Sequence, residues 1–560
     1  MDLFSRLLLA IIFLVFLSSV FVQAQTFDWS VSGNSTRLDE ILSITANTDG
    51  NIYAAGHTIA PSVSIDTLSG TDTTYILIDT IYTSDILLTA FTNSGDPIWQ
   101  KTFTGKGNDR ATHIVSGSEG NFFVTGIFSD TLMLDDVPLQ TSGKFDSDVF
   151  TAMMNNEGNI QWVTQVGGNG NANSAGLATD AFGSAYLGFN FRDTINIHDL
   201  IVVPPDSYNF AVVKYDNNGA LLWHQLGNNE TGITLAAINT DLDGNTYAVG
   251  YFTGYMTFGG YYYESLDETD AFIAKIDSNG NVEWLKTMAY PGIQSLQSIA
   301  TGINSELYVC GQTNEPLTVN NDTIEITGVN SAFVARFSTE DGSVQWITPV
   351  NGWGVSIARQ LSVDADGNAW LAGNFSPTVF YQSDTLNSQG ADDVLLAKLN
   401  PDGQILWIKT AGGVNSETVN TLAFDAGNQL FFAGAFDIQT NFDADTLTSL
   451  GEYDYFLTKI GTSVVTSVAG DFSETPIFNL QSAFRVFPNP ANNLVSLALF
   501  NIEGPISISL FDLNGSVWKQ ETLNKSAEVC EIDVSGLPKG IYLIQVLTST
   551  QQATSKLIVR

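Results

Sequence analysis

A unit of about 61 residues recurs along the chain, and this repeat constrains the fold more than any other feature of the sequence. The clearest landmark of the unit is a tryptophan that lies in its last apolar run. These tryptophans are Trp29, Trp99, Trp162, Trp223, Trp284, Trp346 and Trp407. After a first interval of 70 residues they are 61 to 63 residues apart, so the chain repeats one structural unit.

Two further landmarks precede the tryptophan in each unit. An aromatic residue follows a Gly/Asn turn, at Tyr53, Phe123, Tyr186, Tyr247, Tyr308, Trp370 and Phe431. A polar residue then opens an apolar run, at Asp85, Asp148, Asn209, Asp270, Ser331, Asp393 and Asp454. Apolar runs between Gly, Asn and Asp turns predict four short strands per unit. In the fourth unit we expect them at 234–239, 246–252, 271–276 and 282–287, with a small hairpin between the second and third.

The two ends of the repeat region complete one another. The segment FDWSVSG at 27–33 holds Trp29 with no repeat before it, and the last repeat stops at Lys459-Ile460-Gly461 without its tryptophan. If the N-terminal strand joins the last sheet, the units close into a ring and leave no unpaired strand at either end. We therefore predict an all-β fold in which residues 25–461 form a seven-bladed β-propeller closed by an N-terminal strand.

Except for Trp29, each repeat tryptophan lies four residues after a turn glycine, as in GNIQW, GALLW and GNVEW. This pattern resembles the tryptophan-docking motif of quinoprotein-type propellers, and the unit is similar to the repeats of bacterial seven-bladed propeller proteins. The resemblance implies that the indoles fill the wedge between neighbouring blades with apolar area. It implies no particular function, because propellers host many activities.

The N-terminus has the features of a signal peptide. Arg6 precedes an apolar run over 7–22, and the small-residue site Val22-Gln23-Ala24 predicts that residues 1–24 are removed. An uncleaved signal-anchor is the alternative, although the run is short for a membrane span. The two cysteines, Cys310 and Cys530, fall in different predicted domains, and Cys310 is expected to be a small core residue.

A different pattern begins after the repeats. Residues 462–484 have the small, polar composition of a linker, and alternation over 485–560 predicts a compact β-sandwich. Three elements, Phe487-Pro488-Asn489-Pro490, Asp512 to Gly515, and Leu537-Pro538 with Gly540, Ile541 and Tyr542, resemble the type A sorting domain of the type IX secretion system of Bacteroidetes. The resemblance implies export through the periplasm, recognition by the outer-membrane translocon, and a secreted or cell-surface location. An ordinary stabilising sandwich is the alternative.

The charge of the chain restricts its partners. With 21 Lys+Arg and 59 Asp+Glu the net charge is −38, and the excess lies between residues 25 and 484. Such a surface repels nucleic-acid phosphates and anionic membranes. We therefore expect no nucleic-acid partner and, in the mature form, no membrane span. Cations, basic proteins and neutral glycans remain as partners, and solubility alone also explains the charge.

No catalytic constellation is evident in the sequence. The four histidines, His57, His113, His198 and His224, occupy unlike repeat positions without metal-ligand spacing, and no G-x-S-x-G serine elbow occurs. We therefore assign no catalytic, cofactor-binding or metal residues and expect a protein that is not an enzyme.

Two weaker patterns remain as candidate sites. Asp241-Leu-Asp243-Gly-Asn245 and Asp364-Ala-Asp366-Gly-Asn368 have the oxygen-rich character of calcium loops, but the same turn lacks the acids in other repeats, which favours hairpin chemistry over a calcium cofactor. Tyr261-Tyr262-Tyr263 and Trp353 offer aromatic faces for sugars, although strand alternation is expected to bury some of them.

Three functions are compatible with these patterns. The first is an exported propeller scaffold whose rim loops bind a protein or a glycan, because loops on rigid scaffolds commonly carry recognition. The second is an extracellular propeller enzyme acting on polysaccharide or peptide, with acidic residues at the central opening. The third is a structural component of the cell surface.

Overall fold

The computed structural model describes residues 23–464, with gaps at 34–37, 70–73, 144–145, 267, 303–305, 320–321 and 444, together with parts of 484–559. The predicted signal peptide lies outside the described residues except for its last two positions, and so does most of the predicted linker. The chain divides into two compact units, 1–465 and 466–560, each of which is considered by itself. Across the described ranges, no helix is long and apolar enough to span a membrane.

The fourth repeat shows how one unit folds. Its strands β18 (Gly232–Thr240), β19 (Thr246–Thr253), β22 (Asp270–Ile276) and β23 (Val282–Met288) form one antiparallel sheet in chain order, and each begins and ends within two residues of its predicted span. The predicted hairpin is β20–β21. Its first strand pairs with β17 of the preceding unit rather than with its own sheet, so neighbouring units share backbone hydrogen bonds.

The other repeats give sheets of the same order. The first unit contains β2 (Asp39–Ala46), β3 (Ile52–Ser69), β4 (Thr74–Phe91) and β5 (Pro97–Phe103), the second contains β6 (Arg110–Ser116), β7 (Phe122–Ser129), β10 (Ser147–Met154) and β11 (Ile160–Gly168), and the third contains β12 (Ala172–Thr179), β13 (Ala185–Phe191), β16 (Tyr208–Tyr215) and β17 (Leu221–Asn229). The fifth unit contains β24 (Gln294–Thr301), β25 (Leu307–Thr313), β28 (Ser331–Phe337) and β29 (Val344–Val350), and the sixth contains β30 (Gly354–Val363), β31 (Ala369–Tyr381), β33 (Asp393–Leu399) and β34 (Ile405–Gly413). The last unit contains β35 (Glu417–Phe424), β36 (Leu430–Phe442) and β37 (Asp445–Val464).

Short strands of the additional hairpins are inserted between the second and third strands of several units. They are β8 (Thr131–Leu134), β9 (Val137–Gln140), β14 (Ile195–Ile197), β15 (Leu200–Val202), β20 (Tyr255–Phe258), β21 (Tyr261–Glu264), β26 (Leu317–Val319), β27 (Asp322–Ile324) and β32 (Asp384–Asn387). In the first unit the extra residues lie in the longer β3–β4 hairpin, which accounts for the interval of 70 residues between the first two tryptophans.

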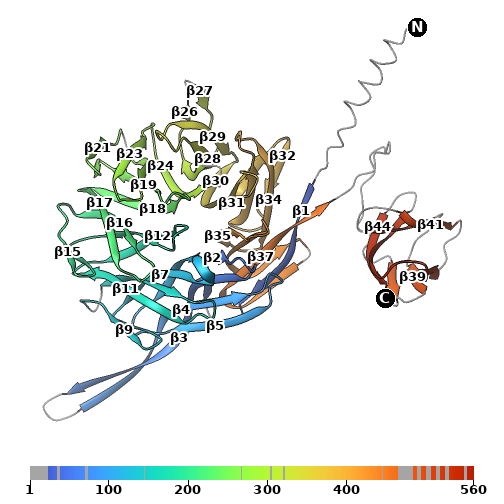
Figure 1. The fold of residues 1–560 in the computed structure, drawn as a ribbon, viewed down its shortest axis with the longest axis horizontal. Helices are drawn as coiled ribbons and strands as arrows, with labels where there is room; N and C mark the ends of the chain where they lie inside the picture. Colours follow the sequence, from blue (N-terminus) through green and yellow to red (C-terminus); the bar gives the residue numbers. More distant parts are fainter. Residues whose placement is uncertain are drawn as a thin grey trace, which may run out of the picture. The chain divides into compact units, whose positions relative to one another are not determined.

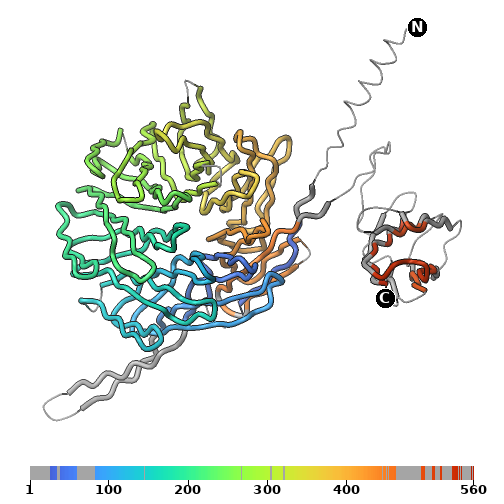
Figure 2. Tube along the Cα trace, in the orientation of Figure 1, coloured from blue at the N-terminus to red at the C-terminus, as the bar shows by residue number. Residues whose placement is uncertain are grey.

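The sheets are arranged as a propeller-like ring. The first strand of each unit contacts the first strands of both neighbours, in the order β2, β6, β12, β18, β24, β30 and β35, and β35 contacts β2 again. Figure 1 shows these strands innermost, and Figure 2 shows the described trace passing around the ring in sequence order. The fold is therefore all-β, with small antiparallel sheets around a common centre.

The N-terminal strand joins the last sheet, as the unmatched ends of the repeat region predicted. Strand β1 (Gln23–Ser32) pairs antiparallel with β37, so that Trp29 lies opposite Lys459 and Ser32 opposite Phe456. Because β1 and β37 come from opposite ends of the repeat domain, their hydrogen bonds link those ends without a disulfide. Cys310 is a buried free thiol on β25, as expected from its place in the repeat.

The repeat tryptophans join neighbouring sheets. The indole of Trp162 lies over Gly219 in the turn of the next unit and donates from Nε1 to Asn217 O at 3.0 Å. A Cβ on Gly219 would lie 2.9 Å from the indole, and this residue also has a φ of +82°, so the turn requires glycine for two reasons. Trp29, Trp99, Trp223, Trp284 and Trp346 make the corresponding hydrogen bonds to Asn93, Asn156, Ser278, Thr339 and Pro401.

The C-terminal unit consists of two antiparallel sheets. One contains β38 (Phe484–Phe487), β39 (Leu494–Leu499) and β42 (Val529–Asp533), and the other contains β41 (Val517–Leu523), β40 (Ile506–Asp512), β43 (Gly540–Leu547) and β44 (Gln552–Val559) in that order. Val495, Leu497 and Ile532 from the first sheet and Leu510 and Ile544 from the second belong to one buried cluster. The alternating pattern of the sequence therefore places one face of each sheet in a common core.

Candidate functional site

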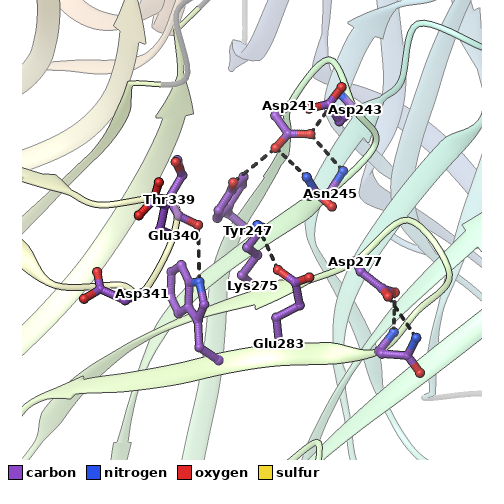
Figure 3. Close-up of polar contacts among 12 residues, drawn as sticks. Asp241, Asp243, Asn245, Tyr247, Lys275, Asp277, Glu283, Thr339, Glu340 and Asp341 are labelled. Carbon is purple, nitrogen blue, oxygen red and sulfur yellow. Dashed lines mark hydrogen bonds and ion pairs between the residues drawn. The ribbon is translucent and has the colours of Figure 1, made fainter.

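The acidic turn of the fourth repeat is a closed set of hydrogen bonds. Asp241 Oδ1 accepts from the backbone N–H groups of Asp243 at 3.1 Å and Asn245 at 2.9 Å. Its Oδ2 accepts from Asn245 Nδ2 at 2.9 Å and from the Tyr247 hydroxyl at 3.1 Å (Figure 3). The carboxylate thus caps the β18–β19 hairpin and holds the aromatic landmark of the repeat.

The second acidic turn has the same construction. Asp364 accepts from the backbone N–H of Asn368 at 2.9 Å and from Trp370 Nε1 at 2.9 Å, and it pairs with Lys398 at 3.0 Å. Burial opposes ionisation of Asp364, but the hydrogen bonds from Trp370, Asn368 and Lys398 outweigh it and hold the pKa of this carboxyl below its ordinary value. In the described part of the chain, no group of three or more His, Cys, Asp or Glu side chains is placed to hold a metal ion. Both turns therefore have the geometry of hairpin caps.

The four histidines lie in different places, and none faces another. His57 lies 3.9 Å from Glu40, His198 bonds to Gly219 O at 2.8 Å, and His224 is on β17. His113 lies on an innermost strand, and burial lowers its pKa to about 4, so its imidazole is neutral at pH 7.

The aromatic candidates are partly buried, as strand alternation predicted. On β21, Tyr261 and Tyr263 point back to β23 and donate their hydroxyls to Glu283 O and Leu285 O at 2.8 and 3.0 Å. Tyr262 points outward, is 57% exposed and stacks on Tyr255 with ring centroids 5.8 Å apart.

Trp353 does not belong to the same surface. It is 66% exposed and lies in the turn before β30, where its ring meets Phe380 edge-on at 5.4 Å. The sequence pattern that grouped it with the β21 tyrosines therefore joined side chains from separate units.

A cavity of about 530 Å³ lies at the centre of the ring and is lined by the first strands of the units. Each of these strands carries a β-bulge at one repeat position, at Leu42, Thr112, Ala175, Ala236, Gln297, Arg359 and Asn420. The lining combines Ser, Thr, Asn and Gln with aliphatic residues of the same strands, and Arg359 is exposed. These bulge positions recur with the same intervals as the tryptophans, but they share no residue type that would mark them in the sequence.

Acidic side chains also meet across the boundaries between neighbouring sheets. Asp85 lies in the third strand of one unit, and Asp109 precedes the first strand of the next; the N–H of Asp109 donates to Ser84 O at 2.8 Å. Asp393 and Glu417 occupy the same two positions at another boundary. Burial, reinforced by the neighbouring carboxylate, raises the pKa of Asp109 to about 7 and that of Glu417 to about 8. Both pairs are buried features of the ring that sequence reasoning missed.

A second cavity, of about 500 Å³, lies between the third and fourth units, where β12, β16 and β18 begin and β13 ends; we call it the rim cavity. Asn171, Asn173, Asn190 and Asn209 line it together with Arg192 and Tyr208. The guanidinium of Arg192 lies 4.3 Å from the centroid of the Tyr208 ring. This rim cavity has the amide, aromatic and cationic groups of a binding site. The sequence marked Asn209 only as a repeat landmark and did not group it with the other lining residues, because they are drawn from separate strands.

In the C-terminal unit, the residues that carry the sorting-domain resemblance converge where they are described. Tyr542 is buried, lies opposite Asp512 in the strand pairing and donates its hydroxyl to Pro538 O at 2.7 Å. Leu537 packs against the core of this unit. The Pro488–Pro490 and Leu513–Gly515 parts of the pattern lie outside the described residues.

Comparison with known families identifies this unit. Residues 485–560 match the family model described as the secretion system C-terminal sorting domain, which confirms the type IX sorting domain that the sequence resembles. The match supports secretion or delivery to the cell surface. No curated protein matches the chain.

Several solved structures are similar to the chain at low sequence identity. Sqt1 from Chaetomium thermophilum is 10% identical with a TM-score of 0.35, covering 77% of this chain and 86% of its own. Quinohemoprotein alcohol dehydrogenase from Comamonas testosteroni is 9% identical with a TM-score of 0.36, covering 82% and 80%. Puromycin hydrolase is 11% identical with a TM-score of 0.39, covering 77% and 57%. At these TM-scores no activity is transferred, and the fold assignment depends on the strand pairing itself.

Proposed function

We propose that this protein is an exported seven-bladed β-propeller that binds a protein or a glycan through its rim, and that it is delivered by a type A sorting domain of the Bacteroidetes type IX secretion system. The match of residues 485–560 to the sorting-domain family is the observation that carries this proposal. In this scheme residues 1–24 direct the chain to the periplasm, and the translocon is the partner of residues 485–560. The mature protein is secreted or held at the cell surface.

Two observations support the propeller of seven blades. The first is that the first strands of the units contact one another in a closed cycle. The second is that each unit has three further strands, and in the last unit β1 is the fourth strand beside β35, β36 and β37. A ring held by tryptophan hydrogen bonds and shared hairpins is a rigid scaffold, and rigid scaffolds commonly present their binding residues on loops and strand ends.

The binding role is supported by what the rim presents. The amide-lined rim cavity and the exposed, stacked Tyr262 offer groups for recognition. The net charge of −38 disfavours nucleic acid and anionic membranes, which leaves neutral glycans and proteins as the favoured ligand classes.

Export is tested by removing residues 485–560 in a host with the type IX system. We expect the full chain outside the cell and the shortened chain in the periplasm. A full-length Trp353→Ala variant is the matched control, because this exposed side chain lies far from the sorting domain in sequence. Appearance of the shortened chain outside the cell would contradict the proposed route.

Binding is tested with the mature full-length chain on arrays of oligosaccharides and of extracellular proteins. We expect saturable binding to one of these classes. Residues 485–560 fused to an unrelated carrier serve as a control for contacts made by the sorting domain alone. Absence of binding at millimolar concentrations of both classes would favour a purely structural role.

A further inference from the structure

The rim cavity lies at a boundary where neither unit supplies an acid at the two facing positions. Where two other boundaries place the carboxyl pairs Asp85/Asp109 and Asp393/Glu417, the third and fourth units place Asn209 and Ile233. An amide and an aliphatic side chain replace two acids. The residues that line this cavity of about 500 Å³ include Arg192 and no carboxyl group.

One buried polar atom in this cavity has no partner. Asn209 is 1% exposed and donates from Nδ2 to Asp206 O at 3.0 Å, but its Oδ1 makes no hydrogen bond. A buried carbonyl oxygen without a donor costs free energy, so a ligand hydroxyl that reached this atom would gain a favourable hydrogen bond.

The surrounding wall is held in place by contacts between the two units. Asn190 bridges them, donating from Nδ2 to Leu235 O at 2.9 Å and accepting from Leu235 N at 2.8 Å. Asn171 accepts from Ser147 N at 3.0 Å through Oδ1, which leaves its Nδ2 donor for solvent or ligand. Fixed amides offer both donors and acceptors, as the hydroxyl groups of a sugar require.

The planar side chains of Arg192 and Tyr208 also line the cavity. Arg192 and Tyr208 stack at 4.3 Å, and an aromatic ring presents an apolar surface on which the C–H face of a sugar packs. Asp206, whose backbone accepts from Asn209, also accepts from the Tyr255 hydroxyl at 3.4 Å. The ring of Tyr255 stacks on the exposed ring of Tyr262, so a second aromatic pair is tied to the cavity through Asp206.

We infer that the rim cavity is a binding site for a neutral polysaccharide, with one sugar unit beside Asn209 and Arg192 and the next over the Tyr255–Tyr262 pair. Asp193, Asp206 and Glu230 lie within a few residues of the lining positions, while Arg192 is the one basic side chain that lines the cavity as described. That balance favours uncharged sugars over uronates or sulfated chains. This inference rests on the proposed binding function and names its site and ligand class.

The experiment measures binding of the mature full-length chain to cellohexaose, xylohexaose, laminarihexaose and mannohexaose by calorimetry, with polygalacturonate as the acidic comparison. We expect one neutral oligosaccharide to bind, and Arg192→Ala and Tyr208→Ala to weaken it at least tenfold. Tyr208→Phe keeps the ring and is expected to bind within about twofold of the wild type. Trp353→Ala, on another unit, is the matched control, and thermal melting verifies that every variant is folded.

The outcomes distinguish this site from the proposed binding function as a whole. Loss confined to the Arg192 and Tyr208 truncations supports the site. If a neutral oligosaccharide binds but these truncations leave its affinity unchanged, the proposed function stands and this cavity is not the site. Binding of polygalacturonate alone, or of none of the probes, overturns the inference, and the protein arrays then decide whether the proposed binding function survives.

Discussion

The indole Nε1 of Trp29 donates a hydrogen bond to the backbone carbonyl of Asn93, 3.2 Å away. Trp29 belongs to β1 in the last sheet, and Asn93 lies in a turn of the first unit, so this contact crosses the boundary where the ring closes. The Asn93 side chain strengthens the same boundary. Its Oδ1 accepts from Lys459 Nζ at 2.7 Å, and its Nδ2 donates to Asp425 at 2.7 Å.

Asn93→Ala is therefore expected to lower the free energy of unfolding by about 2 to 3 kcal/mol, because it leaves a partly buried lysine and carboxylate without their amide partner. Chemical denaturation of the mature chain measures the change. Ser278→Ala is the matched control: Ser278 accepts the equivalent tryptophan hydrogen bond through its backbone, so a change of less than about 1 kcal/mol is expected. Equal effects of the two substitutions would contradict a special role of Asn93 in closure.

Trp284→Ala tests the packing role of the repeat tryptophans. This indole is 7% exposed, packs against Tyr247 and donates to Thr339 O at 3.4 Å. Its loss leaves a cavity between two sheets, and we expect a cost of about 3 to 5 kcal/mol. Trp353→Ala removes a side chain of the same size that is 66% exposed and is expected to cost less than about 1 kcal/mol. A melting temperature unchanged by Trp284→Ala would refute the packing role.

The carboxyl pairs between sheets predict that stability falls as the pH rises. Burial raises the pKa of Asp109 to about 7 and that of Glu417 to about 8, above the values of the unfolded chain. Between about pH 5 and 8 the folded state then binds more protons than the unfolded state, so the free energy of unfolding decreases with pH. The lowered pKa of His113, about 4, acts in the opposite direction but only below about pH 6.5.

Glu417→Gln is expected to flatten this profile, with a relative gain of about 1 to 3 kcal/mol at pH 8 compared with pH 6. The neutral amide removes the charge that faces Asp393 and Asp437 in the folded state. Urea denaturation from pH 5.5 to 8.5 measures the profile. A variant that retains the wild-type slope would show that Glu417 does not hold its proton in the folded protein.

The acidic turns are predicted to act without calcium. Asp364→Ala removes the acceptor of Trp370 Nε1 and the partner of Lys398, and we expect a loss of about 2 to 4 kcal/mol. Because the loss comes from these internal contacts, it is expected to be the same in EDTA and in millimolar calcium.

Asp366→Ala is the control that separates the two interpretations of this turn. The side chain of Asp366 is exposed, and hairpin chemistry predicts a change of less than about 1 kcal/mol. A calcium loop would need Asp366 as well as Asp364. Calcium-dependent stability that both substitutions abolish would therefore overturn the hairpin interpretation.

The sequence by itself determined the strands, their order and the way the ends of the repeat domain meet. These features depend on local or periodic patterns. Gly and Asn turns determine where the hairpins lie, and the alternation of apolar and polar residues determines which face of each strand is buried. The Trp29 strand, which has no repeat before it, completes the last sheet. The sorting domain was also evident, because its three motif elements follow one another in order within residues 485–560.

Only the tertiary structure decided which side chains from different units share a site. Asn209 and Arg192 form a cavity with residues of the fourth unit, and Asp393 meets Glu417, because the ring places the end of one sheet beside the start of the next. The sequence pattern grouped Trp353 and Tyr262 as aromatic candidates for sugar binding, but the two side chains lie in different units and have different neighbours. The repeat period shows which positions of the units are equivalent. Contacts between units depend instead on how neighbouring sheets pack and on which hairpins pair with a strand of the neighbouring unit.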